Sequence, residues 1–199
     1  MGMSLENPTE ILAFIFSTMG LIAMITSSLL KGKSMKLILF LVFLSNAFVA
    51  ISYFIGGQGL NGAASCLLGA TQSIINFFFD KKNKPLPRWL VAIYAVSFVG
   101  VNIAVSFNGM FTFGDTFGVD YKAVVLCCLA IAGCLAFIMC IGQKNGAKYR
   151  FWTLINMLMW CTYDLISGNV QVLITHIVQL TFAVVGMIIH DRKNKKEIK

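Results

Sequence analysis

The sequence predicts an all-α integral membrane protein with seven transmembrane helices, built as two parallel three-helix repeats joined by a linker helix (3+1+3). Three observations predict this fold class: a very apolar composition, seven apolar stretches near the length of a bilayer span, and an internal repeat. Of the 199 residues, 58% are hydrophobic and 12% are charged, and the mean hydropathy is +0.80. A soluble core of this size does not need so much apolar surface.

Seven stretches approach the roughly 20 residues that a helix needs to cross a bilayer. Glycine-rich segments at 56–59 and 167–169 predict tight turns after the second and sixth stretches. Pro85 and Pro87 break the chain before the fourth stretch, and the longest connection, Asn108 to Lys122, follows it. The expected spans are Ile11 to Leu30, Leu37 to Ile55, Gly62 to Phe79, Trp89 to Phe107, Ala123 to Gly142, Phe151 to Ile166, and Val170 to His190.

The basic residues predict the orientation, because short loops rich in Lys and Arg stay in the cytoplasm. We therefore expect the N-terminus, with Glu6 and Glu10, to lie outside and the C-terminus to be cytoplasmic. The net charge of +8 then belongs to loops that face anionic lipid headgroups, and nucleic acid is not an expected partner. The four basic patches are Lys31, Lys33 and Lys36; Lys81, Lys82, Lys84 and Arg88; Lys144, Lys148 and Arg150; and Arg192, Lys193, Lys195, Lys196 and Lys199.

An internal repeat emerges when the second span is aligned with the sixth. The matched residues are Asn46 with Asn156, Tyr53 with Tyr163, and Gln72 with Gln179. Each half also closes with a similar segment, residues 80–83 and 191–194. The repeat predicts a first triple-helix bundle at residues 1–84, a linker helix at 85–108, and a second bundle with a basic tail at 109–199. A single linking helix gives both bundles the same orientation in the membrane.

Polar side chains inside the spans are the candidates for function. An unsatisfied polar group in hydrocarbon costs several kcal/mol, so such groups turn toward the bundle interior. The candidate solute-binding residues are Asn46, Tyr53, Gln72, Asn76, Asn156, Trp160, Tyr163 and Gln179. The alternative is structural, because an amide that bridges two helices contributes about 0.6 kcal/mol. Trp160 has a second alternative, an anchor at the lipid interface.

Asp164 is the only acidic residue inside an expected span, and it lies near the outer end of the sixth. His176, in the next span, is a candidate partner for it, and the two are candidate gate residues that would respond to pH. The alternative for a lone histidine on an apolar helix is a packing role.

Enzyme, cofactor and metal functions are not expected. The chain has two histidines, His176 and His190, too few for an intramembrane zinc site with several His ligands. It also has no glycine-rich phosphate loop of the Gly-x4-Gly-Lys-Ser/Thr type.

Several motifs resemble bacterial inner-membrane proteins of the YgjV type: Tyr53-x2-Gly56, Gly59-x2-Gly62-Ala63, and the segment from Arg150 to Tyr163. Those proteins look like distant relatives of the SWEET sugar facilitators and the PnuC vitamin transporters. The resemblance implies a 3+1+3 bundle in the bacterial inner membrane. It also implies solute contacts from paired asparagines and aromatic residues, for which Asn76 is the nearest match in the third span. The segment Trp152-x3-Asn156-x6-Tyr163 is similar to the PnuC pattern.

These observations lead us to expect a uniporter-like facilitator for a small, mostly uncharged polar solute, such as a sugar, nucleoside or vitamin, that works by alternating access of the two bundles. The expected partners are membrane lipids and the solute, and association into a homo-oligomer is left open. The alternative is a non-transporting membrane protein, such as an assembly factor, regulator or sensor. A central cavity framed by Asn46, Asn76, Asn156 and Gln179 would favour transport, and a closed, dry core would favour the alternative.

Overall fold

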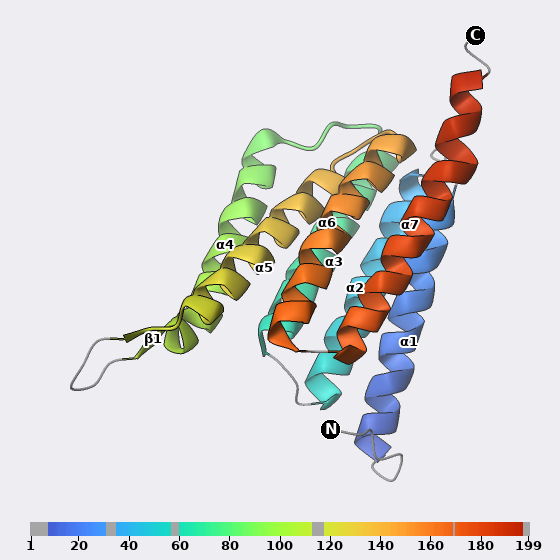
Figure 1. The fold of residues 1–199 in the computed structure, drawn as a ribbon. Helices are drawn as coiled ribbons and strands as arrows, with labels where there is room; N and C mark the ends of the chain where they lie inside the picture. The colour runs from blue at the N-terminus through green and yellow to red at the C-terminus, as the bar shows by residue number, and fades with distance from the viewer. Residues whose placement is uncertain (1–7, 31–34, 57–59, 113–117, 169, 197–199) are drawn as a thin grey trace.

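A computed structural model describes residues 8–30, 35–56, 60–112, 118–168 and 170–196, and these form an all-helical bundle (Figure 1). The prediction of an all-α fold with seven helices is confirmed within these residues. Successive helices run up and down, so α1, α3, α5 and α7 all finish at one end, here called the basic end. The helices are α1 (Pro8–Leu29), α2 (Met35–Gly56), α3 (Leu60–Lys81), α4 (Arg88–Met110), α5 (Tyr121–Ile141), α6 (Gly146–Ser167) and α7 (Val170–Lys196).

The sixth helix begins earlier than expected. It starts at Gly146 rather than Phe151, because the Asn145 side chain accepts a hydrogen bond from the backbone N–H of Ala147 at 2.8 Å and caps the first turn. At its other end, Gly168 adopts a left-handed conformation with φ of 81° and donates its N–H to the carbonyl of Asp164. The predicted turn after the sixth span is therefore present at Gly168.

The connection between the fourth and fifth helices is more ordered than the expected loop from Asn108 to Lys122. Helix α4 continues to Met110, and two short antiparallel strands follow, β1 (Phe111–Thr112) and β2 (Gly118–Val119). The Asp120 carboxylate then accepts hydrogen bonds from the backbone N–H groups of Lys122 and Ala123 and caps α5.

The helices pack as a ring in the order of the sequence. Each helix contacts the next, and α7 closes the ring by packing against α1 (Figure 1). The expected linker, α4, packs against both α3 and α5. Glycine allows neighbouring helices of this ring to approach each other closely. A Cβ on Gly20 of α1, for example, would lie 2.7 Å from Val49 Cγ2 and 3.0 Å from the Ser45 carbonyl oxygen of α2.

The outer surface of the bundle has the character of a lipid-facing surface. Every helix exposes large apolar side chains, including Phe14 of α1, Leu67 of α3 and Leu165 of α6. Five helices in the described part of the chain are long and apolar enough to cross a membrane, namely α1, α2, α4, α5 and the Leu173–His190 part of α7. Helices α3 and α6 have the same length as α1, 22 residues, but are less apolar because they carry most of the buried amides and Asp164.

The basic end of the bundle is densely packed. Ile38, Val42, Ile141 and Tyr149 are each at most 2% exposed there. In addition, Ser27 Oγ of α1 and the Tyr149 hydroxyl of α6 are 3.2 Å apart. This packing joins the first half of the chain to the second.

The assignment of Arg150 to a cytoplasmic loop is wrong. Arg150 lies inside α6, is 2% exposed, and donates from Nη1 to the Leu30 carbonyl at the end of α1 at 3.1 Å. His190 of α7 donates from Nε2 to the neighbouring Leu29 carbonyl at 2.8 Å. Both side chains satisfy carbonyls that a helix end leaves without a partner, and Arg150 brings positive charge to the negative end of the α1 dipole.

Candidate functional site

A cavity of about 260 Å³ lies inside the bundle, and all seven helices contribute to its wall. It runs from the middle of the bundle toward the end opposite the basic end, because its lining includes Tyr53 near the end of α2, Cys66 near the start of α3 and Asp164 near the end of α6. The packed residues around Tyr149 close the basic end.

Six of the eight predicted binding residues line this cavity, and so do both predicted gate residues. Spacing explains the large contribution of α6, since residues at i, i+4, i+7 and i+8 share one face of a helix. The lining residues among the predicted set are Asn46, Tyr53, Asn156, Trp160, Tyr163, Gln179, Asp164 and His176.

Asn156 sits on the cavity wall near the centre of α6 and is 3% exposed. Among the residues that the structure describes, no group donates a hydrogen bond to its Oδ1 atom. A buried acceptor left without a donor costs about 1–3 kcal/mol. Gln72, Asn76 and Asn102 also have amide oxygens without a partner among the described residues, but of these four residues Asn156 is the one that lines the cavity. Its Oδ1 is therefore placed to accept a hydrogen bond from a solute.

Asn46 faces the cavity from α2. Its amide nitrogen donates to the Val42 carbonyl at 2.9 Å, one turn earlier in the same helix. Its Oδ1 points toward α3, where a Cβ on Gly69 would lie only 2.9 Å from it. Glycine at position 69 thus makes room for the amide on the cavity wall.

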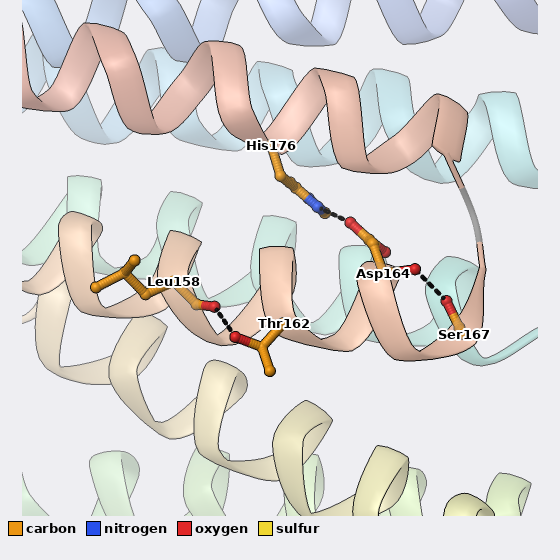
Figure 2. Close-up of polar contacts among 5 residues, drawn as sticks. All are labelled: Leu158, Thr162, Asp164, Ser167 and His176. Carbon is orange, nitrogen blue, oxygen red and sulfur yellow. Dashed lines mark hydrogen bonds and ion pairs between the residues drawn. The ribbon is translucent and has the colours of Figure 1, made fainter.

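Asp164 and His176 line the cavity near its end farthest from the basic end. Figure 2 shows their side chains pointing toward each other. His176 Nδ1 of α7 lies 2.5 Å from Asp164 Oδ2 of α6. The carboxylate residue is 3% exposed, and the Ser167 hydroxyl donates to its backbone carbonyl at 3.1 Å. The predicted pairing of these two residues is confirmed, and their role as a gate stays a prediction.

Aromatic rings form the wall beside this pair. The Trp160 ring centroid lies 6.0 Å from that of His176 and 5.5 Å from that of Tyr163, which it meets edge to face. A Cβ on Gly133 of α5 would lie 3.0 Å from Trp160 Nε1, so the indole packs directly on the α5 backbone. The wall next to Asp164 is both aromatic and rigidly supported.

Gln72 and Asn76 lie outside the cavity lining. They continue the α3 stripe that begins at Cys66 and Gly69, but farther toward the basic end. Asn76 donates from Nδ2 to the Ile141 carbonyl in the last turn of α5 at 3.1 Å, which is the bridging role considered from the sequence. Gln72 is fully buried, and neither of its amide atoms has a partner among the described residues. Solute contact by these two residues stays a prediction.

Several cavity residues were not predicted from the sequence, including Ser45, Ser65, Cys66 and Cys134. Small side chains on apolar helices normally indicate close packing, so the sequence alone does not identify them as cavity residues. In the structure these small side chains leave space beside the bulky rings of α6. Among the described residues, no group of three or more His, Cys, Asp or Glu side chains is arranged to hold a metal ion.

Searches of protein-family models, curated proteins and solved structures find no significant match to this chain. The argument for function therefore rests on the cavity.

Proposed function

We propose that this chain is a membrane facilitator that binds a small polar solute in the central cavity and moves it by alternating access, without ATP. The observation that carries the proposal is the buried, unpartnered Oδ1 of Asn156 on the wall of a cavity of about 260 Å³. Asn46 and Gln179 line the same cavity, so three of the four amides expected around a central cavity are on its wall, which supports the proposal. A dry core with paired amides would have favoured a non-transporting protein.

In this proposal all seven helices cross the membrane and are grouped as 3+1+3. Helices α3 and α6 are the more polar spans and line the path of the solute. The proposal also includes an outside N-terminus, a cytoplasmic C-terminus and a bacterial inner-membrane location, as the basic patches and the resemblance to YgjV-type proteins suggest. In this arrangement the contacts of Tyr149, Arg150 and His190 with α1 hold the cytoplasmic side closed. Inward opening would break these contacts as the first three helices rock against the last three.

Solute binding is tested by thermal unfolding of the detergent-purified chain across a panel of sugars, nucleosides and vitamins. A bound solute at a hundred times its dissociation constant should stabilise the native state by about 2.7 kcal/mol. We expect at least one solute to do so in the wild type and to lose the effect in Asn156→Ala, which removes the unpartnered acceptor.

Asn102→Ala is the matched control. Asn102 is also a buried asparagine, 1% exposed, and its Oδ1 likewise has no partner among the described residues. It lies outside the cavity lining, and its Nδ2 donates to the Phe98 carbonyl of its own helix. It should keep solute stabilisation despite any loss of basal stability. If no solute stabilises the wild type and Asn156→Ala is markedly less stable than the wild type, Asn156 is structural and the non-transporting alternative is favoured.

A further inference from the structure

Three residues of the cavity wall bring acceptor oxygens to it. Asn156 presents an unpartnered Oδ1, and Asn46 presents an Oδ1 beside Gly69 while its Nδ2 donates to the Val42 carbonyl. Asp164 adds a carboxylate. A solute that satisfies these three residues must bring hydrogen-bond donors.

The charges on the cavity wall favour a cationic solute. No lysine or arginine is among the described residues that line the cavity, whereas Asp164 is. When the imidazole is neutral, His176 donates its Nδ1 proton to Asp164 and the carboxylate keeps its negative charge. A carboxylate in a setting that excludes water attracts a cation more strongly than it would in solution.

The aromatic wall favours a cation as well. Trp160 and Tyr163 lie beside Asp164, and the faces of indole and phenol rings attract positively charged groups within about 6 Å. An anionic solute would meet the carboxylate and the rings with no lysine or arginine among the described lining residues to offset them.

We propose that the solute of this cavity carries a protonated amine or a similar N–H-rich cationic group, with Asp164 as its counter-charge and Trp160 and Tyr163 as its aromatic wall. This inference rests on the proposed function and narrows its substrate class. From the sequence we expected a mostly uncharged solute, with Asp164 as a gate residue near the outer end of the sixth span. The structure places the Asp164 carboxylate on the cavity wall.

The test compares three probes that share one ring and one side-chain length and differ in charge: tyramine, tyrosol and 4-hydroxyphenylacetate. Dissociation constants are measured by calorimetry on the detergent-purified full chain. We expect tyramine to bind at least about tenfold more tightly than tyrosol, because hydrogen bonds to charged groups are the stronger ones, and 4-hydroxyphenylacetate to bind most weakly. This comparison within the wild type needs no variant.

Asp164→Asn should remove the preference for tyramine while tyrosol binding changes little. The matched control is Asp120→Asn, which removes the same charge at the same end of the bundle but from the exposed cap of α5, where asparagine also caps well. Equal binding of the three probes, or tightest binding of the anion, would overturn the cationic preference and leave the cavity as a solute site. Binding of none of the probes would also overturn it, and the solute panel with Asn156→Ala would then decide the proposed function separately.

Discussion

Replacing Arg150 by glutamate is expected to destabilise the folded chain by about 3–5 kcal/mol, the range seen when a buried charge loses its partner. Arg150 is 2% exposed and donates to the Leu30 carbonyl at the end of α1. Glutamate would place a second acceptor against that carbonyl and a negative charge at the negative end of the helix dipole. Thermal or denaturant unfolding of the purified protein measures the loss.

Lys148→Glu provides the control for Arg150→Glu. Lys148 is exposed and lies in the same turn of α6, so both variants reverse one charge in the same basic patch and perturb membrane orientation equally. The Lys148 variant should stay within about 0.5 kcal/mol of the wild type, as surface changes usually do. Equal stability of the two variants would show that Arg150 does not hold α1 to α6.

The second large effect is expected at Gly186, where α7 packs on α1. A Cβ at this position would lie 2.5 Å from the Ser28 carbonyl oxygen and 3.1 Å from Arg150 Cδ. Because the closest atom is backbone, the two helices must separate to admit even alanine. Gly186→Ala should therefore lower the free energy of unfolding by about 1–3 kcal/mol, the usual effect of overpacking.

Gly100→Ala should act in the opposite direction. A Cβ at Gly100, in the middle of α4, would meet nothing within 4 Å. Alanine there removes backbone freedom from the unfolded chain and should stabilise the helix by about 0.5–1 kcal/mol. If both alanine variants shift unfolding in the same direction and by similar amounts, then α7 does not close against α1 as described.

The length of the apolar stretches and the glycines between them were enough to predict the seven helices. The number of apolar residues that a helix needs to cross a bilayer does not depend on which helices pack against it. Helix ends were harder to predict. Residues 146–150 carry Lys148 and Arg150 and were interpreted as loop, although the Asn145 cap starts α6 before them. The ring order depends on which small residues meet, such as Gly186 with Ser28, and the sequence does not reveal those partners.

Spacing on one helix predicted the α6 face of the cavity, because helical geometry alone brings Asn156, Trp160, Tyr163 and Asp164 together. The position of each amide along the bundle axis, relative to the ends of the cavity, was harder to predict. Gln72 and Asn76 share the stripe of Gly69 but lie beyond the end of the cavity, where α3 packs on α5. The side chains that close the end of a cavity come from several helices. The spacing of residues along one helix therefore does not predict where the cavity ends.

Flux into proteoliposomes shows whether the cavity moves a solute across the membrane. The solute that most stabilises the purified chain is supplied outside vesicles that contain the wild type or Asn156→Ala, without ATP or an ion gradient. We expect saturable uptake by the wild type that stops at equal concentrations on the two sides, and uptake at the level of empty vesicles in the variant. Uptake no faster than that of empty vesicles, by a protein that still binds the solute, would contradict transport and identify the cavity as the site of a non-transporting receptor or sensor.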